Sequence, residues 1–330
     1  MLKMVVDTMG SDNGTSATVP GIITFLKNHN DVEIYAVGKI EELEALKDYP
    51  NVTLIDARQV VPMEAGALDV MRAKDSSMLV AINKFLEVGA DAIVSAGSTG
   101  GFLSSTTLKL KLIEGVERAA LISPFPTKIK GKKVTVLDIG ANNENTPEQL
   151  VQFAKLGKIY ANKVFGIEKP NIYLLSNGAE DGKGSPTVKA AHKLLKQENM
   201  EGFKGNIEAR YALDGEADVI VTGGFEGNIF LKGVEGVASM MGKMIKSAFK
   251  RNIFSMIGYL FANKGFKEIS ETMEYKSTGG AMLLGVNGVV VKGHGSSDAY
   301  SFSCAMNVAY KMAKANIVEQ IKEGIKENAK

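Results

Sequence analysis

Residues 134–163 read VTVLDIGANNENTPEQLVQFAKLGKIYANK, and this stretch holds the unit that decides the fold. A short apolar run, residues 134–138, leads into a polar loop with a glycine and then into a helical-period segment, residues 147–163. The pattern repeats at once, with a strand predicted over residues 171–176 and a helix over 186–198. Such alternation is typical of βαβ units, whose strands form a largely parallel sheet covered by helices on both faces. The sequence therefore predicts an α/β fold.

The same type of apolar run recurs along most of the chain. A strong two-residue hairpin signal, Asn287-Gly288, separates two more strand candidates near the end, residues 282–286 and 289–292, so an antiparallel piece joins the sheet. No Pro/Ser-rich linker, low-complexity segment or internal repeat divides the chain. We therefore expect one domain over residues 1–330, with a helical excursion over residues 236–275. The remaining predicted strands are residues 3–7, 32–37, 52–55, 91–95, 119–123 and 218–222.

The 35 glycines concentrate where the predicted strands end. Glycine allows backbone N–H groups to approach a ligand closely, and the start of a following helix favours an anion. Because ligands bind beyond the carboxyl ends of parallel strands, we expect these loops to meet at one edge of the sheet. Glycine also closes ordinary turns, so the expectation depends on the whole set. The loops are DTMGSDNG (7–14), SAGSTGG (95–101), DIGANNEN (138–145), SNGAEDGKG (176–184), TGGFEGN (222–228) and KGHGSSDA (292–299).

The loop before residue 186 resembles a nucleotide-binding P-loop but differs in its spacing. The interval from Gly178 to Lys183 is one residue short of that motif, and Gly184 stands where the motif has the hydroxyl that binds magnesium. Lys183 could therefore bind an anion other than a nucleotide. The alternative is a solvated lysine at a helix start, although lysine is unfavourable at that end of a helix dipole.

Composition excludes several classes of protein. The net charge of +2 and the absence of a dense basic run argue against nucleic acid as a partner. Cys304 is the only cysteine, so a reducing cytosol is the simplest location. No apolar run is long enough to span a membrane. The three histidines lack ligand spacing, so we expect no metal and no cofactor.

Several motifs, in one order along nearly the whole chain, resemble the bacterial phosphate acyltransferases of phospholipid synthesis, the PlsX type. The resemblance implies a three-layer α/β/α fold related to isocitrate dehydrogenase and phosphotransacetylase, and a homodimer. It also implies transfer of a long-chain acyl group from acyl-carrier protein to inorganic phosphate, giving acyl phosphate. The motifs are VVDTMGSD (5–12), AKDSSM (73–78), VSAGSTGG (94–101), LDIGAN (137–142), the Lys183-Gly184 loop, GFEGN (224–228) and GGAMLLGVNGVVVKGHGSSDA (279–299).

On this resemblance, free phosphate is a substrate, so the loop around Lys183 needs no magnesium-binding hydroxyl. Phosphate is already an anionic nucleophile, so direct attack on the thioester needs positioning and oxyanion donors, but no acyl-enzyme. His294 is a candidate for stabilising the oxyanion or protonating the leaving sulfur. The predicted catalytic residues are Lys183, His294, Asn228 and Asn142. The predicted substrate-binding residues are Asp7, Gly10, Asp12, Ser98, Thr99, Gly100, Gly140, Gly184, Gly227, Gly295, Ser296, Ser297 and Asp298.

Some predicted groups have a simpler alternative role. Asp12 and Asp298 stand where a helix cap is expected, and Cys304 is expected to be packed in the core. The AKDSSM segment is a candidate for a secondary contact with phosphate or carrier protein. The chain departs from the family's usual motifs in its glycine loops, which puts substrate preference and rate in doubt, at Thr8, Ser11, Ser98, Ala179 and Gly223.

The excursion is basic, and an apolar stripe runs through it at helical spacing. Residues 249–261 therefore suit a helix at a membrane interface, or alternatively a core or dimer-contact helix. The family resemblance favours peripheral contact with the inner face of the cell membrane, near a membrane-bound glycerol-3-phosphate acyltransferase. Acyl-carrier protein is acidic, so part of the basic surface could instead bind it. The basic residues are Lys243, Lys246, Lys250, Arg251, Lys264 and Lys267, and the stripe is Phe249, Ile253, Ile257, Leu260 and Phe261.

Three other functions remain open at this point. A phosphotransacetylase that uses acyl-CoA would need the same fold and chemistry. A decarboxylating dehydrogenase of the related fold would need a metal-binding aspartate group and a nicotinamide site, and the sequence shows neither. A non-catalytic relative that associates with lipid is the third alternative.

Overall fold

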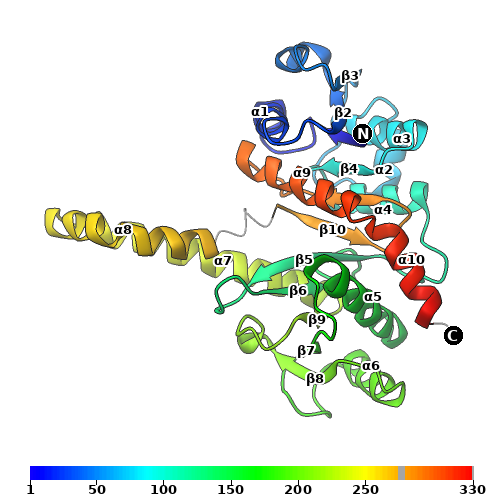
Figure 1. Ribbon diagram of the computed structural model, residues 1–330, viewed down its shortest axis with the longest axis vertical. Helices are drawn as coiled ribbons and strands as arrows, with labels where there is room; N and C mark the ends of the chain where they lie inside the picture. The colour runs from blue at the N-terminus through cyan, green and yellow to red at the C-terminus, as the bar shows by residue number, and fades with distance from the viewer. Residues whose placement is uncertain (274–278, 329–330) are drawn as a thin grey trace.

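The computed structural model describes residues 1–273 and 279–328 and has the predicted α/β architecture (Figure 1). The strands are β1 (Leu2–Asp7), β2 (Val32–Gly38), β3 (Val52–Asp56), β4 (Ala92–Ser95), β5 (Ala120–Pro126), β6 (Lys133–Leu137), β7 (Ile172–Ser176), β8 (Phe203–Glu208), β9 (Val219–Val221), β10 (Ala281–Leu284) and β11 (Val289–Lys292). The helices are α1 (Thr15–Leu26), α2 (Ala67–Arg72), α3 (Ser77–Val88), α4 (Thr99–Leu110), α5 (Pro147–Phe165), α6 (Pro186–Gln197), α7 (Gly224–Phe249), α8 (Ile253–Met273), α9 (Ala299–Lys314) and α10 (Ile317–Asn328).

One 11-stranded sheet passes through the molecule in the order β3-β2-β1-β4-β11-β10-β5-β6-β9-β7-β8. The predicted hairpin at Asn287-Gly288 is confirmed, because β10 and β11 pair in antiparallel fashion. The edge strand β8 was not predicted. Its sequence, FKGNIE, carries charged, amide and glycine residues, which an edge position tolerates better than a buried one.

Strand direction reverses across the middle of the sheet. The pairs β11–β10, β10–β5 and β5–β6 are antiparallel, whereas every other neighbouring pair is parallel. Strands β6, β9, β7 and β8 therefore run opposite to β1, β4 and β11. The expectation that all six glycine loops share one edge is wrong, because three of them follow strands of the reversed group.

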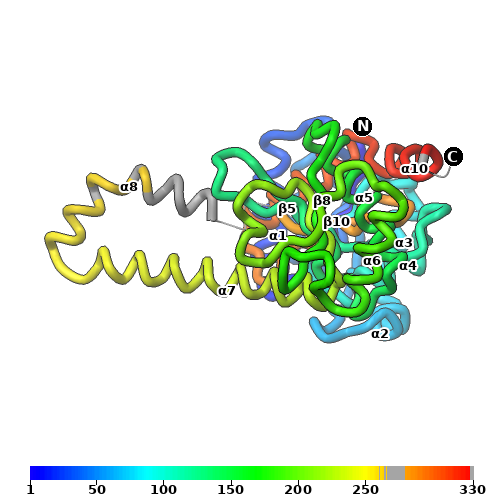
Figure 2. The backbone as a smooth tube through the Cα atoms, turned by 90° about the horizontal axis from the view of Figure 1, so that it is seen from below, coloured from blue at the N-terminus to red at the C-terminus, as the bar shows by residue number. Residues whose placement is uncertain are grey.

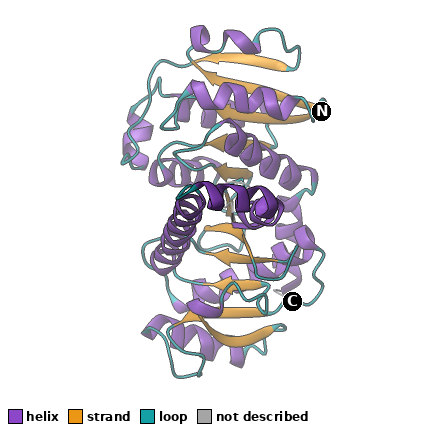
Figure 3. Ribbon diagram, turned by 90° about the vertical axis from the view of Figure 1, so that its left-hand side faces the viewer, coloured by secondary structure: helices purple, strands orange, loops and turns teal. Residues whose placement is uncertain are grey.

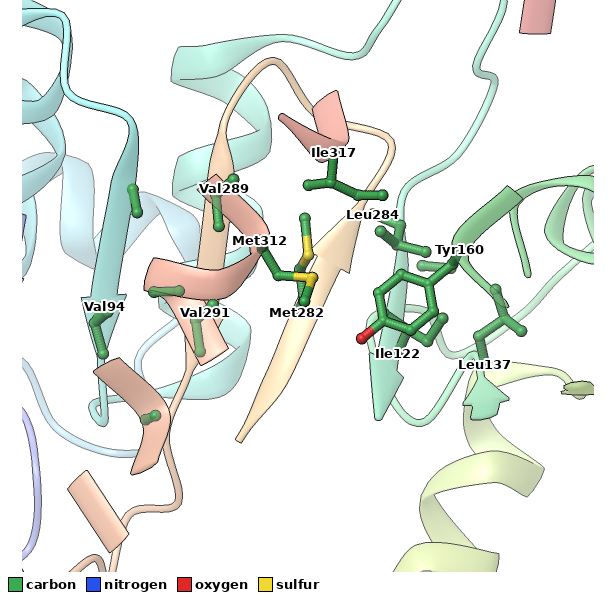
Figure 4. Packing of buried hydrophobic residues seen from close by; sticks show 14 of the residues in the cluster. Val94, Ile122, Leu137, Tyr160, Met282, Leu284, Val289, Val291, Met312 and Ile317 are labelled. Atoms are coloured by element: carbon green, nitrogen blue, oxygen red, sulfur yellow. The ribbon is translucent and has the colours of Figure 1, made fainter. Parts of the chain in front are cut away.

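Helices cover both faces of the sheet (Figure 3), and each strand contributes alternate residues to two apolar clusters. In β1, for example, Met4 belongs to one cluster and Val5 to the other. On the first face, Met312 of α9, Ile317 of α10 and Tyr160 of α5 lie over the central strands (Figure 4). On the second face, α2, α3 and α4 pack together. This is the predicted three-layer arrangement.

Helices α7 and α8 form a hairpin that projects from the body (Figure 2). The predicted continuous helix over residues 249–261 is wrong, because α7 ends at Phe249 and α8 begins at Ile253. Asn252 interrupts it: its Oδ1 accepts a hydrogen bond of 2.9 Å from the N–H of Ser255, in the first turn of α8. Part of the predicted excursion, residues 274–275, lies outside the described residues. Among the residues that are described, none of the helices is long and apolar enough to cross a membrane.

Candidate functional site

A cavity of about 560 Å³ opens on the second face of the sheet, over the central strands where strand direction reverses. The loops after β4 and β11 line one side, β5 forms an apolar wall, and α7 closes the other side. It is lined by Met63, Gly97, Thr99, Gly100, Leu121, Ser123, Pro124, Phe125, Pro126, Ile139, Gly140, Asn143, Asn228, Leu231, Lys232, Glu235, Gly279, Gly280, Ala281, Lys292, Gly293, His294, Gly295, Ser296, Ser297 and Ser301.

Asp7 joins the loops after β1 and β4 beneath this cavity. Its carboxylate is fully buried and accepts a 2.7 Å hydrogen bond from the Ser95 hydroxyl, which in turn accepts one of 3.1 Å from the N–H of Gly97. Burial raises the pKa of Asp7, although the bonds from Ser95 and neighbouring groups oppose that shift. A Cβ on Gly10 would lie 2.6 Å from Asp7 Oδ2, so Gly10 lets these loops come together. Asp7 and Gly10 thus hold the site from below.

His294 lies in the loop after β11, between the sheet and α7. Its Nδ1 is 2.9 Å from the Ser296 hydroxyl and accepts a hydrogen bond of 3.2 Å from the N–H of Ser296, so Nε2 carries the proton of the neutral ring. Nε2 faces Glu235 at 3.9 Å, and Glu235 pairs with Lys232 at 2.9 Å. Burial acts to raise the pKa of Glu235, but the contacts with His294 and Lys232 outweigh it and lower that pKa. These residues form a charged rim on the cavity.

The loop after β6 wraps around Asp138. Its carboxylate accepts hydrogen bonds from the backbone N–H groups of Leu121 at 2.9 Å, Ala141 at 2.8 Å and Asn142 at 3.0 Å. Burial nevertheless raises the pKa of Asp138. The start of α7 packs directly on this loop, since a Cβ on Gly227 would lie 1.9 Å from the Asp138 carbonyl oxygen. Asp138 and Gly227 therefore fix where α7 presents its side chains.

The structure brings one part of the predicted site together around this cavity. These residues are Thr99, Gly100, Gly140, Asn228, His294, Gly295, Ser296 and Ser297. Their catalytic and binding roles remain predictions.

Asn142 was predicted to be a catalytic residue, but its side chain does not line the cavity. Its Nδ2 donates to the Ala119 carbonyl at 2.9 Å and to Asp138 Oδ2 at 2.7 Å, and its Oδ1 accepts from Arg118 Nε at 2.6 Å. All of these partners belong to the protein, so the amide is committed to holding the loop. The next residue, Asn143, lines the cavity instead.

Lys183 and Gly184 also lie outside the cavity lining. Their loop follows β7, which belongs to the reversed group and is separated from β5 by β6 and β9. The Lys183 side chain is exposed, and the N–H of Gly184 donates to Asn177 Oδ1 at 2.9 Å. The structure does not bring this loop together with the others.

The other predicted residues serve the loops rather than line the cavity. Asp298 caps α9 by accepting from the N–H of Ser301 at 2.9 Å, as the alternative interpretation expected. Ser98 caps α4 in the same way and is buried. Asp12 does not cap α1, because Gly14 holds the N-cap position of that helix. The backbone N–H of Asp12 donates instead to the Gly295 carbonyl at 2.9 Å. In the AKDSSM segment, Ser76 caps α3.

Comparison with known proteins identifies the family. A family model described as "Fatty acid synthesis protein" matches residues 2–320. A phosphate acyltransferase of Clostridium botulinum is 41% identical over 329 residues, covering 98% of this chain and 98% of the relative. The chain belongs to the phosphate acyltransferase family. A phosphate acyltransferase of an Exiguobacterium species is also 41% identical, over 325 residues that cover 97% of this chain and 98% of the relative.

Solved structures support the fold of this phosphate acyltransferase family member. A phosphotransacetylase from Streptococcus pyogenes superimposes with a TM-score of 0.58 at 16% identity, covering 96% of this chain and 94% of that one. A branched-chain phosphotransacylase from Enterococcus faecalis gives a TM-score of 0.56 at 14% identity, covering 95% and 99%. The phosphotransacetylase-like fold is thus confirmed. Family membership shows that the chain is an acyltransferase that transfers an acyl group to phosphate.

Sequence reasoning missed several residues of the cavity in this family member. Lys232 and Glu235 stand one helical turn apart in α7, just after the GFEGN motif, and that spacing was a usable signal. Lys292 precedes the GHGSSDA motif directly and was included in the loop without being given a role. The apolar wall of Leu121, Phe125 and Leu231 resembles ordinary core sequence and gave no signal.

The cavity combines two chemistries. Its lining carries ammonium, imidazole and hydroxyl groups and glycine-rich backbone, which suit an anion. The apolar wall of Leu121, Phe125 and Leu231 suits a hydrocarbon chain. In the described residues, no group of three histidine, cysteine, aspartate or glutamate side chains is placed to hold a metal ion.

Proposed function

We propose that this protein transfers a long-chain acyl group from the thioester of acyl-carrier protein to inorganic phosphate, giving an acyl phosphate for phosphatidic acid synthesis. Membership of the phosphate acyltransferase family supports transfer to phosphate. The observation that carries the rest is one cavity in which an anion-binding end adjoins an apolar wall. A thioester carbonyl positioned between the two would meet phosphate on one side while its acyl chain follows β5.

In this mechanism, an oxygen of hydrogen phosphate attacks the thioester carbonyl carbon directly. A C–O bond forms, the C–S bond breaks, and the proton of hydrogen phosphate ends on the departing thiol. His294 can assist this transfer, because its Nε2–H lies at the rim and can donate a hydrogen bond to the departing sulfur as that proton arrives. The Asn228 amide donates to the oxyanion. No acyl-enzyme is needed, because phosphate is itself a nucleophile.

The proposal extends to where the protein works. We place it in the cytoplasm as a homodimer that contacts the inner face of the cell membrane and delivers acyl phosphate to a membrane-bound glycerol-3-phosphate acyltransferase. The projecting α7–α8 hairpin (Figure 2) supports such a contact, because Phe254 and Phe261 of α8 are 81% and 87% exposed.

Acyl phosphate trapping tests the proposed activity. The purified protein, inorganic phosphate and hydroxylamine are incubated either with long-chain acyl-carrier protein or with the matching acyl-CoA. We expect acyl hydroxamate with the carrier protein, dependent on phosphate and unaffected by EDTA. Product from acyl-CoA but not from acyl-carrier protein would show that acyl-CoA is the donor. No product from either donor would contradict the proposal.

A further inference from the structure

Lys292 is a charged residue in a position that normally holds an apolar one. It ends β11, whose preceding residues Val289, Val290 and Val291 are all in the core, and it is itself only 7% exposed. Lysine usually leaves its ammonium in water, because removing the charge from water costs several kcal/mol. A buried lysine that lines a cavity therefore indicates a ligand that compensates this cost.

The face toward which Lys292 points follows from strand geometry. Side chains alternate along a strand, and Val290 lies in the cluster on the cavity face. Lys292 pairs with Ser95 of β4, and Ser95 hydrogen-bonds to Asp7 of β1. Three neighbouring strands thus place a carboxylate, a hydroxyl and an ammonium in one polar row, and Lys292 is the member of that row that lines the cavity.

The ammonium has capacity left for a ligand. In the part of the chain that the structure describes, its hydrogen bond goes to the carbonyl oxygen of Gly293. An ammonium has three donors, so two remain. Asp7 and Asp12 favour the charged form of Lys292 electrostatically, without a direct ion pair, whereas Lys232 of α7 disfavours it. Lys232 itself is paired with Glu235 and has a side chain that is 58% exposed.

We propose that the Lys292 ammonium binds the inorganic phosphate nucleophile in this cavity, together with backbone N–H groups of the glycine loops after β4 and β11. This inference rests on the proposed function and assigns its phosphate site to Lys292 rather than to the exposed Lys183. Thr99, Ser296 and Ser297 line the same end and can complete the contacts.

The protonation state of Lys292 supports this role and gives it a signature. Burial lowers its pKa to about 8, with Lys232 adding to the effect and Asp12 and Asp7 opposing it. The ammonium is therefore charged at pH 7 and loses its proton as the pH rises through 8. We expect kcat/KM for phosphate to fall above that pH.

Enzyme kinetics test the proposal through one neutral and one charged substitution. Lys292→Met should raise the apparent KM for phosphate roughly ten- to a hundred-fold and leave the KM for the acyl donor within about two-fold. Lys292→Arg should retain phosphate binding and lose the fall in kcat/KM above pH 8, because guanidinium stays charged. Lys204→Met is the matched control, because the Lys204 side chain on the edge strand β8 is exposed, and it should change neither constant. A normal phosphate KM in Lys292→Met, or a raised one in Lys183→Met alone, would overturn the assignment.

A measurement on the unaltered protein separates this inference from the acyl-transfer proposal. Acetic anhydride at pH 8 acetylates neutral lysine amines, and mass spectrometry gives the extent at each lysine. Inorganic phosphate should lower acetylation of Lys292 at least several-fold and leave Lys183 and Lys204 unchanged. This measurement uses the unaltered protein and no acyl donor. Protection of Lys292 by phosphate can therefore be observed even if no acyl phosphate forms. Absence of protection by phosphate would contradict the role of Lys292.

Discussion

Asn142 and Asn143 are adjacent residues with the same side chain and opposite surroundings. Asn142 is buried and bonded to Asp138, Ala119 and Arg118, whereas Asn143 lines the cavity. The sequence correctly placed amides after β6, but it could not decide which one faces the ligand. That choice depends on how the loop turns around the Asp138 carboxylate, which accepts backbone N–H groups from several directions.

This difference predicts opposite effects of two substitutions. Asn142→Ala removes the partner of buried groups, so the free energy of unfolding should fall by about 1–3 kcal/mol while turnover per folded molecule stays close to normal. Asn143→Ala should change stability by about 0.5 kcal/mol or less and lower kcat/KM. Urea denaturation and acyl phosphate trapping measure the two quantities. A stable but inactive Asn142→Ala protein would show that Asn142 is an oxyanion donor after all.

At the scale of elements, α7 owes its position to two glycines. A Cβ on Gly224 would lie 2.0 Å from the Asn142 carbonyl oxygen, and one on Gly227 would lie 1.9 Å from that of Asp138. These backbone atoms cannot move aside as a flexible side chain can, so only glycine allows α7 to pack this closely against the loop. Asn228, Lys232 and Glu235 reach the cavity because of this seating. Gly227 was predicted to bind substrate, whereas in the structure it allows α7 to pack against the Asp138 loop.

Gly227→Ala should therefore displace α7 and lower stability by at least about 1–3 kcal/mol, with a loss of activity. Gly236→Ala in the same helix is the matched control, since its Cβ would meet nothing within 4 Å. Alanine is the better helix former there and should stabilise the protein by about 0.5–1 kcal/mol. Thermal unfolding and acyl phosphate trapping check both variants. Equal stability of the two proteins would contradict the seating of α7 on the Asp138 loop.

The elements themselves were largely predictable, whereas their directions were not. Apolar runs bounded by glycine loops indicated nearly every strand, and Asn287-Gly288 indicated the hairpin. The antiparallel pairing of β10 with β5 had no local signal, because it joins segments far apart in the sequence. The antiparallel pairing of β5 with β6 did have one, since the connection over residues 127–132 is too short for a parallel crossover, but this pairing was not predicted from the sequence. Lys183 lies away from the cavity although its loop has the same composition as the others, because β6 and β9 separate β7 from β5, which forms the cavity wall.

At the scale of the whole molecule, the α7–α8 hairpin extends apolar surface away from the body (Figure 2). Phe254, Met256 and Ile257 are 81%, 52% and 47% exposed at the start of α8. Lys243, Lys246, Lys250 and Arg251 are exposed beside them. The sequence predicted this combination of apolar and basic residues, but placed it on one helix instead of on two joined at Asn252.

If this hairpin meets lipid, the protein should sediment with vesicles, and more strongly when they contain anionic lipid. The apolar residues bury in the interface, and each basic residue contributes roughly 1 kcal/mol near an anionic surface. Salt should weaken binding by screening these charges. Ile257→Glu should abolish binding even at low salt, because it places a carboxylate on the apolar surface. Activity on soluble acyl-carrier protein should remain close to normal.

The matched control for this prediction is Leu108→Glu, which adds the same charge at an apolar residue of the body that is 63% exposed. It should leave vesicle binding unchanged, so that any loss in Ile257→Glu belongs to the hairpin and not to net charge. Size-exclusion chromatography with light scattering distinguishes the remaining explanation. If Ile257→Glu dissociates a dimer, the exposed residues of α8 pack against a second copy of the chain, and the membrane contact is contradicted.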